Sequence, residues 1–239
     1  MGKKTLALDL DETLVHSSFK TPKKPDIILP VDIEGRICNV YVLVRPNCVK
    51  FLTEMAKYYE VVIYTASLSK YADPLMDILD QNRVAPQRLF REHCTFYNGL
   101  FIKDVSRLGR RLSDSIIIDN SPMSYMFQPE NGIPILSWYD DREDNKLMEL
   151  VPVLKAMSRV QDVRRIITES TRDNIMNLEK ALKLCERECQ PTVPPPQTIE
   201  MRNDGMRMQT DGMRITAEDG PDIDNSEQKK LKQFHQNTN

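Results

Sequence analysis

Three short apolar runs, each ending on a polar residue, constrain the fold of this chain more than any other feature. Residues 5–8 run into Asp9, residues 61–64 into Thr65 and residues 116–118 into Asp119. Continuous apolar runs without alternation are typical of strands that are buried on both faces of a parallel sheet. Helical patterns lie between the runs. The alternation of strand and helix therefore predicts a doubly wound α/β sheet with flanking helices.

Ligands of such sheets bind beyond the carboxyl ends of the strands. Asp9, Thr65 and Asp119 all stand at such ends, so we expect them to gather at one edge although they are far apart in sequence. The alternating pattern of residues 26–44, interrupted by Glu34 and Gly35, predicts a small antiparallel β insert after the first strand.

Helices are expected in three places between and after the strands. The first follows Asn47, which can serve as its N-cap, and its apolar positions are Val49, Leu52, Met55, Ala56 and Tyr59. The second is expected to begin at Ser69 as its N-cap and to contain Pro74 near its start. Its inward-facing residues are expected to be Leu75, Ile78 and Leu79. The third carries Pro152 in or near a bent turn and the apolar positions Leu147, Leu150, Val151, Leu154 and Met157.

The sequence divides into a domain of residues 1–168, an amphipathic helix of residues 171–190 and a flexible polar tail of residues 191–239. The apolar stripe of that helix is Ile175, Leu178, Leu182, Cys185 and Cys189. The stripe can dock on the domain or bind a partner helix. We favour docking, because the stripe is too short for a sustained coiled coil.

Composition excludes several classes of function. The net charge of -2 argues against a protein that binds nucleic acid through its overall charge. The five cysteines are scattered without a CxxC pair, which favours a reducing compartment over disulfides or a zinc site. We expect no signal or transit peptide and no membrane contact, hence a location in the nucleus, the cytoplasm or both. The oligomeric state stays open.

An acid pair carries the first chemical signal. Asp9 and Asp11, two residues apart at a strand end, project to the same side. Two carboxylates at ~4 Å repel by about 4 kcal/mol at an effective dielectric of 20, so the pair needs a cation or a shared proton. Mg²⁺ suits one or two carboxylates with substrate phosphate, and an Asp carboxylate can also attack phosphorus. The alternative is an acidic turn that caps a helix.

Three further elements follow in chain order: Thr65, whose hydroxyl can bind a phosphoryl oxygen; Lys103, whose cation can offset negative charge; and Asp119 with Asn120, which suit hard oxygen coordination. Each alone is weak, since a strand-end Thr, a surface Lys and an Asn-Ser-Pro turn are all common. Together they supply the nucleophile, acid/base, donor, cation and metal ligands of a phosphoryl-transfer site.

At this level the chain resembles the haloacid-dehalogenase superfamily, and within it the small phosphatases that act on the C-terminal domain of RNA polymerase II. The resemblance covers about residues 1–168. It is carried by the stretches DLDETLVHSSFK (9–20), YVLVRP (41–46), YTASLSKYADP (64–74), KDVSRLGR (103–110) and DNSPMSYMFQPENGIPILSW (119–138).

The resemblance assigns roles to individual residues. It implies that Asp9 is the nucleophile and a magnesium ligand, and that Asp11 is the general acid and base, with a backbone carbonyl on the metal. Thr65 and Lys103 would hold the phosphoryl group, while Asp119 and Asn120 would complete the metal shell. Thr13 and Arg91 are expected on the substrate side of the site.

The same family holds a substrate proline in an apolar pocket on its insert. The matching positions are Phe19, Val31, Ile33, Val40, Leu68 and Tyr71. The alternative is that these side chains only pack the insert against the domain. We favour the pocket, because an apolar patch on an insert is commonly a binding site.

We therefore expect a magnesium-dependent protein serine/threonine phosphatase with an aspartyl-phosphate intermediate. Its partner would be a phosphorylated protein, such as the RNA polymerase II C-terminal domain or another phosphoprotein that contains proline. Two alternatives share the fold. One is a binding module like the presequence receptor of the mitochondrial translocase, and the other is a Dullard-type phosphatase that regulates lipid metabolism.

Overall fold

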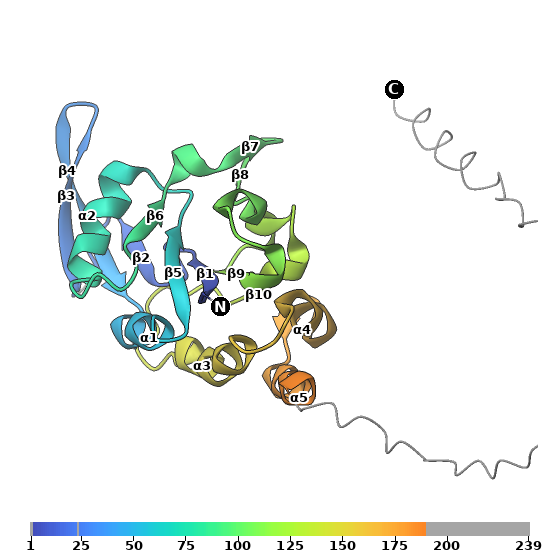
Figure 1. The fold of residues 1–239 in the computed structure, drawn as a ribbon. Coiled ribbons are helices and arrows are strands. Elements are labelled where there is room, and N and C mark those ends of the chain that lie inside the picture. Colours follow the sequence, from blue (N-terminus) through green and yellow to red (C-terminus); the bar gives the residue numbers. More distant parts are fainter. Residues whose placement is uncertain (1, 23, 190–239) are drawn as a thin grey trace, which may run out of the picture. The chain divides into compact units, whose positions relative to one another are not determined.

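A computed structural model describes residues 2–22 and 24–189, and a five-stranded parallel sheet forms their centre. Its strands are β1 (Lys4–Leu8), β5 (Tyr59–Tyr64), β6 (Gln87–Leu89), β9 (Ser115–Asp119) and β10 (Gly132–Pro134). The strand order is β10-β9-β1-β5-β6 (Figure 1). The predicted parallel α/β sheet is confirmed. The three apolar runs are its three interior strands, and the two short edge strands are additions that the sequence pattern did not predict.

The register of the interior strands brings their polar ends together. Leu8 of β1 pairs with Ile63 of β5 on one side and with Ile118 of β9 on the other. The backbone N–H of Asp9 continues the ladder and donates to the carbonyl of Ile118 at 3.0 Å. Residues that follow β1, β5 and β9 therefore meet at one edge of the sheet, as parallel strands require.

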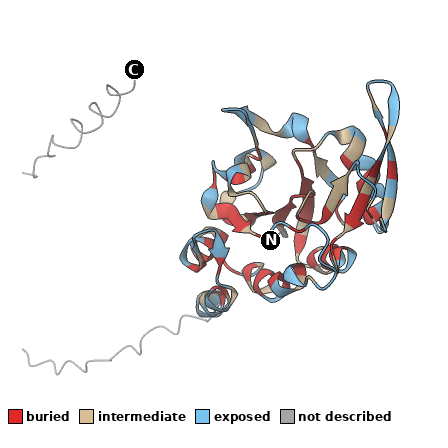
Figure 2. Cartoon of the chain, turned by 180° about the vertical axis from the view of Figure 1, so that it is seen from behind, coloured by how far each residue is buried: buried red, intermediate tan, exposed pale blue. Residues whose placement is uncertain are grey.

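The two faces of the sheet are covered differently (Figure 2). One face packs against a large core to which all five α-helices contribute, namely α1 (Cys48–Met55), α2 (Ser69–Leu79), α3 (Lys146–Met157), α4 (Val163–Ser170) and α5 (Leu178–Cys189). The other face, with Ala7, Tyr64 and Ile117, packs against Val105 and Tyr125. These two residues belong to the short 3-10 turns η2 (Val105–Leu108) and η4 (Pro122–Tyr125). The second face is thus held by turns instead of helices.

A three-stranded antiparallel sheet, which we call the flap, follows β1. It consists of β2 (Val15–Ser18), β3 (Ile27–Ile33) and β4 (Arg36–Val44) in the order β2-β4-β3. The predicted insert is confirmed as the β3–β4 hairpin, whose turn is Glu34 and Gly35. The third strand of the flap, β2, was not predicted, because it is only four residues long and lacks a clear apolar alternation. Helix α2 packs against β3 and joins the flap to the domain.

The helix boundaries differ from the predicted ones in detail. Asn47 does precede α1, but its backbone is left-handed (φ 63°) and its side chain makes no capping hydrogen bond. Tyr59 lies in β5 instead of on the helix, and its buried hydroxyl donates to the carbonyl of Leu154 at 2.6 Å. Ser69 is the first residue of α2 and does not cap it, because Leu68 occupies the N-cap position.

Two apolar positions of the predicted helices are exposed, and one of them, Ile78, was predicted to face inward. Val49 is 46% exposed and Ile78 is 41% exposed. Each lies on its helix at the margin of the apolar stripe, where α1 and α2 border a shallow surface groove. Pro152 lies inside α3, in agreement with the prediction.

The remaining small elements connect the strands. A hairpin of β7 (Thr95–Tyr97) and β8 (Leu100–Ile102) leads directly into Lys103, and 3-10 turns occur at η1 (Arg91–His93), η3 (Leu112–Asp114) and η5 (Pro129–Asn131). At the start of β10 a glycine is required, since a Cβ on Gly132 would lie 2.1 Å from the Tyr125 ring.

The C-terminal part of the described chain begins differently from the prediction. A small hairpin of β11 (Thr171–Arg172) and β12 (Ile175–Met176) precedes α5, so the helix starts at Leu178 and not at residue 171. Asp173 (φ 51°) and Asn174 (φ 58°) form the left-handed turn of this hairpin and interrupt the helical pattern. Ala181 and Cys185 are buried against the core, so α5 docks on α3 and α4. The predicted tail, residues 191–239, lies outside the described residues.

Across residues 2–22 and 24–189, no helix combines the length and the apolar character that crossing a bilayer would require.

Candidate active site

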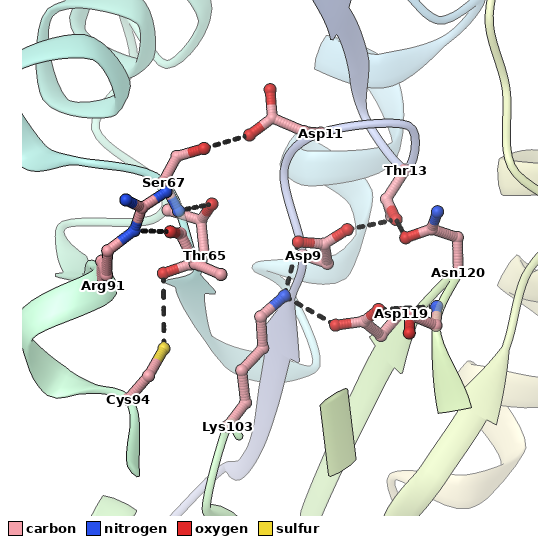
Figure 3. A network of polar contacts seen from close by, with 12 residues as sticks. Asp9, Asp11, Thr13, Thr65, Ser67, Arg91, Cys94, Lys103, Asp119 and Asn120 are labelled. Atoms are coloured by element: carbon pink, nitrogen blue, oxygen red, sulfur yellow. Dashed lines mark hydrogen bonds and ion pairs between the residues drawn. The ribbon is translucent and has the colours of Figure 1, made fainter. Parts of the chain in front are cut away.

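A buried lysine joins two of the predicted strand-end acids. The Nζ of Lys103 lies 2.5 Å from Oδ1 of Asp9 and 2.6 Å from Oδ2 of Asp119. All three side chains are at most 8% exposed. Figure 3 shows Lys103 reaching up from β8 between the ends of β1 and β9. Residues from three separate stretches of the sequence therefore meet at the edge of the sheet, as predicted.

Burial and the neighbouring charges shift the pKa values of Lys103 and Asp119. Burial alone lowers the pKa of Lys103, but the charges of Asp9 and Asp119 and their hydrogen bonds outweigh burial and raise it. Burial raises the pKa of Asp119 to about 6, and repulsion from Asp9 adds to this rise, while the charge and hydrogen bond of Lys103 oppose it. The group thus keeps one surplus negative charge, which favours a further cation beside it.

The second oxygen of Asp9 is held by Thr13. The Thr13 hydroxyl donates to Oδ2 of Asp9 at 2.7 Å and lies 3.4 Å from Oδ1 of Asn120. Both Asp9 oxygens are therefore fixed, one by an ammonium and one by a hydroxyl. Thr13 was expected to contact substrate, but its side chain is fully buried. It is placed to orient Asp9 instead. We call Asp9, Thr13, Lys103 and Asp119 the polar cluster.

An ion pair beneath the loop fixes its backbone. Arg45 is 1% exposed and donates to the carbonyl of Thr13 at 3.0 Å. Its other nitrogens bind both carboxylate oxygens of Asp144 at 2.7 and 2.9 Å. Hydrogen bonds from Arg45 hold the pKa of Asp144 below its usual value against the effect of burial. The bidentate pair locks the guanidinium plane, and through it the loop that carries Asp9.

Thr65 directly follows β5, near Asp9 (Figure 3), and is 1% exposed. Its hydroxyl oxygen accepts the backbone N–H of Ser67 at 3.0 Å. Within the described part of the chain its hydroxyl proton is not committed, so it can be donated to an incoming oxygen. The site thus offers an ammonium and a hydroxyl for negative charge.

The Asp11 side chain turns away from the polar cluster, toward the flap (Figure 3). Ser67 donates to its Oδ2 and Tyr71 donates to its Oδ1, both at 2.7 Å. Glu12, the next residue, has a left-handed backbone (φ 56°), which costs energy in a non-glycine residue and helps to direct Asp11. Burial raises the pKa of Asp11, although the two hydroxyls oppose this by stabilising the charged form.

The donors beside Asp9 fit Mg²⁺. Asp9 Oδ2 and Asn120 Oδ1 both lie at the Thr13 hydroxyl and face the same point. No group of three or more His, Cys, Asp or Glu side chains stands at metal-binding spacing within the described ranges. The donors at this point are oxygens of Asp9 and Asn120, whereas a structural zinc site uses nitrogen and sulfur ligands. A few oxygen donors beside a surplus negative charge are what Mg²⁺ prefers, because it keeps several of its waters.

A pocket of about 470 Å³ opens beside Asp11, between the flap and α2. All six predicted apolar positions line it, namely Phe19, Val31, Ile33, Val40, Leu68 and Tyr71. We call these six residues and the space between them the flap pocket. Phe19 and Leu68 at its mouth are 66% and 42% exposed, so the pocket has an open apolar rim.

Comparison with known proteins identifies the family of this chain. Residues 4–164 match the family described as NLI interacting factor-like phosphatase, which is more than half of the chain. The chain belongs to this family. It is 56% identical over 170 residues to a "Probable C-terminal domain small phosphatase" of Dictyostelium discoideum, covering 71% of this chain and 56% of that protein. It is 54% identical over 162 residues to the human "CTD small phosphatase-like protein", covering 68% and 59%.

The chain thus spans a little over half the length of these curated family members. The solved structure of "Fcp1, an essential RNA polymerase II CTD phosphatase" shares the fold. It superposes with a TM-score of 0.57 at 17% identity, over 74% of this chain and 68% of that chain. At this identity the likeness concerns architecture alone.

Arg91 contacts the candidate active site of this chain less directly than predicted. Its Nε donates to the carbonyl of Ala66 at 2.6 Å, and its guanidinium lies 4.9 Å from the Phe101 ring centroid. It also lines the flap pocket, near Asp11. Its present contacts support the loop after β5, and a charge at the pocket wall remains available to a substrate.

Three residues with evident structural importance to the site were not predicted. Ser67, Arg45 and Asp144 all lie in or beside the quoted family stretches but carry no recognisable motif of their own. Only Arg45 gave a usable signal. An arginine at the end of a buried strand needs a carboxylate partner, and the acids after Trp138 supply one.

Proposed function

We propose that this chain is a magnesium-dependent phosphoprotein phosphatase that transfers the phosphoryl group to Asp9. The observation that carries the proposal is the double hold on the Asp9 carboxylate, by Lys103 at 2.5 Å and by Thr13 at 2.7 Å. A carboxylate whose two oxygens are fixed in a buried site is oriented before the substrate arrives, and such preorganisation is a large part of catalysis.

In the first step, Asp9 attacks phosphorus and the bond from phosphorus to the serine or threonine oxygen breaks. The departing oxygen takes a proton from Asp11. The raised pKa of Asp11, which follows from burial, favours the protonated form that this step needs. Asp11 must rotate from its contacts with Ser67 and Tyr71 to reach the leaving oxygen, and its place at the wall of the flap pocket puts it on the substrate side.

In the second step, a water attacks phosphorus and the bond from phosphorus to Asp9 breaks. Asp11, now charged, accepts the proton of that water. The products are inorganic phosphate and free Asp9. The Lys103 ammonium and the Thr65 hydroxyl lie where they can bind phosphoryl oxygens in both steps, so the charge that builds up meets fixed donors.

The metal site is part of the same proposal. Asp9, the Asp11 carbonyl, Asp119 and Asn120 would hold Mg²⁺, which when bound offsets the charge of the phosphoryl oxygens. Asp119 also keeps Lys103 in position, and its Oδ1 accepts the N–H of Ser121 at 2.8 Å.

A phosphorylated protein is the substrate that the site favours. The flap pocket gives the site an apolar wall, which a phosphoserine with a nearby proline would fill better than a small metabolite. A mouse relative of 52% identity is named for the carboxy-terminal domain of RNA polymerase II, which makes that domain, or another phosphoprotein that contains proline, the candidate substrate. A location in the nucleus, the cytoplasm or both would be consistent with such a substrate. We rank the non-catalytic receptor lower, because every predicted catalytic side chain is present.

Hydrolysis of para-nitrophenyl phosphate with and without Mg²⁺ tests the proposal. We expect turnover with Mg²⁺, little without it, and a loss of at least about 10⁴-fold in kcat for Asp9→Asn, since an amide cannot form the acyl phosphate. Asn keeps the size of Asp, so a matching unfolding curve would show that folding is preserved. Activity that survives this substitution would overturn the mechanism, and inactivity of the intact chain would favour the receptor.

A further inference from the structure

A second groove lies on the side of the candidate active site away from the flap. Its volume is about 410 Å³. Its walls come from the segment after β10, the first turns of α3 and the hairpin before α5. We call it the β10 groove and define it by Pro134, Leu136, Glu149, Leu150, Ile175 and Met176.

Asn120 links the β10 groove to the polar cluster. Asn120 lines its near end. The Oδ1 of the same residue lies 3.4 Å from the Thr13 hydroxyl, which in turn donates to Asp9 at 2.7 Å. The Nδ2 of Asn120 donates to the Ser137 hydroxyl, another lining residue, at 2.8 Å. The groove therefore begins within two hydrogen-bond contacts of the proposed nucleophile.

The sheet order puts this groove and the flap pocket on opposite sides of Asp9. The flap pocket is lined by residues that follow β1 and β5, whereas the β10 groove is lined by residues that follow β9 and β10. In the order β10-β9-β1-β5-β6, the two sets are divided between β9 and β1, and Asp9 follows β1 at this division. Figure 1 shows the flap and the β10 side of the sheet on opposite sides of β1 and β9.

Apolar side chains on two separate walls of the β10 groove are open to solvent. Leu136 is 67% exposed and Ile175 is 69% exposed, and the buried Leu150 and Met176 lie among them. Single exposed apolar residues are ordinary, but a contiguous set in a groove is typical of a binding site. The left-handed turn at Asp173 and Asn174 presents Ile175 at this position.

We propose that the β10 groove binds the stretch of substrate polypeptide on the other side of the phosphoresidue from the flap pocket. The proposal rests on the proposed function. A phosphoresidue at Asp9 places its two flanking segments over the two ends of the site. One segment meets the flap pocket and the other meets the β10 groove, where Leu136 and Ile175 take an apolar side chain. The Lys146–Glu149 pair at 2.9 Å gives this end a polar rim for the backbone.

Ile175 and Ile37 form a matched pair for the test. Ile37 is 71% exposed, lies in β4 and lines neither the flap pocket nor the β10 groove. Ile175→Ser and Ile175→Asp would be compared with Ile37→Ser and Ile37→Asp in the full chain. The serine variants separate loss of apolar contact from repulsion of a negatively charged phosphopeptide. Para-nitrophenyl phosphate, which has no flanking chain, measures the chemistry alone.

The substrates are phosphoserine peptides in which one flank of the phosphoserine contains a proline and is kept constant. The other flank is either a segment that contains leucine or a segment of glycines only. Each peptide is made in two orientations, with the proline flank before or after the phosphoserine. We expect the leucine segment to lower KM in one orientation only. Ile175→Ser should raise that KM about tenfold, the effect of losing one buried aliphatic contact, with kcat within twofold. The Ile37 variants and all para-nitrophenyl phosphate rates should stay unchanged.

Equal KM values for the leucine and glycine peptides in both orientations would overturn the proposal. The proposal would also be overturned if Ile175→Ser changed the oligomeric state in size-exclusion chromatography but left every KM unchanged. The groove would then be an interface between copies of the chain. In both cases hydrolysis of para-nitrophenyl phosphate would continue, so the proposed function would stand. Loss of that hydrolysis in the unaltered chain would instead refute the proposed function.

Discussion

The polar cluster and the flap pocket lie side by side but are built in opposite ways. In the cluster every charged side chain is at most 8% exposed and is tied to a partner. In the flap pocket, Phe19 and Leu68 are 66% and 42% exposed and the lining is mainly apolar. The first arrangement suits chemistry, because fixed charges in a dry site need no reorganisation. The second suits recognition, because apolar surface is left for a partner to cover.

This contrast predicts that changes in the cluster act on kcat for every substrate, whereas changes in the flap pocket act on KM for peptides. After loss of the nucleophile itself, the largest effect is expected for Lys103→Met. It removes the cation that joins Asp9 and Asp119 and should lower kcat by about 10²–10³-fold for both para-nitrophenyl phosphate and phosphopeptides. Steady-state kinetics on the two substrates measures this.

Lys103→Met should also lower the free energy of unfolding by about 3–5 kcal/mol, because two buried carboxylates are left without their cation. Adding Asp119→Asn removes one of those charges and should restore most of the stability but none of the activity. If the double variant regained the kcat of the unaltered chain, Lys103 would contribute to stability alone. The prediction that the polar cluster determines kcat would then be wrong for Lys103.

A smaller and more selective effect is expected in the flap pocket. Phe19→Ala and Leu68→Ala should each raise KM for a phosphopeptide with proline by about tenfold, since each removes part of an apolar contact. Rates on para-nitrophenyl phosphate should stay within twofold of the unaltered chain. Ile37→Ala, a change in strand β4 of the flap but outside the pocket, is the matched control. Equal losses on both substrates would mean that the pocket residues only pack the flap.

Tyr71 belongs to both regions and can sharpen the boundary between them. Its ring lines the flap pocket while its hydroxyl donates to Asp11 at 2.7 Å. Tyr71→Phe keeps the ring, so KM for peptides should hardly change. The Tyr71 hydroxyl stabilises the charged form of Asp11, which accepts the proton of water in the second step, so its loss should lower kcat about fivefold on both substrates. A change in KM alone would assign Tyr71 to recognition and leave Ser67 as the sole support of Asp11.

The smallest effect on activity is expected for the ion pair beneath the loop. Asp144→Asn should lower the free energy of unfolding by about 2 kcal/mol near pH 7, less than for a fully buried pair because Asp144 is partly exposed. The pKa of Asp144 in the folded chain lies below that of an ordinary aspartate, because the hydrogen bonds and charge of Arg45 outweigh burial. The contribution of the pair is therefore complete above about pH 4 and is lost as the pH falls through the folded pKa.

Chemical denaturation of the unaltered chain and the Asp144→Asn variant between pH 3 and pH 8 measures this. The difference in stability should be constant above about pH 5 and should shrink below about pH 4. A difference that stays constant down to pH 3 would show that the charge of Asp144 does not matter.

The same contrast explains what could be predicted from the sequence. The interior strands and the meeting of Asp9, Lys103 and Asp119 were predictable, because uninterrupted apolar runs fix buried strands and the strand ends fix where polar residues gather. The short elements were not. Strand β2 and the edge strands β6 and β10 have three or four residues each, too few for a periodic signal. Asp173 and Asn174 adopt left-handed turns that a helical pattern conceals.

Within the site, roles were easier to predict than orientations. The sequence supplied Asp11 and Thr13 as polar residues in one loop, but not that Asp11 turns to Ser67 and Tyr71 while Thr13 turns inward to Asp9. Those directions depend on the left-handed Glu12 and on Arg45 bound to the Thr13 carbonyl. They are tertiary contacts between distant segments, and no local pattern encodes them.

Chemical trapping of the phosphorylated residue tests the central claim most directly. The chain would be quenched during turnover of para-nitrophenyl phosphate with Mg²⁺ and reduced with borohydride, which converts an acyl phosphate of aspartate to homoserine. Peptide mass spectrometry should then find homoserine at position 9 and at no other aspartate. Turnover that leaves residue 9 as unmodified aspartate, with the label on a different residue, would contradict the account.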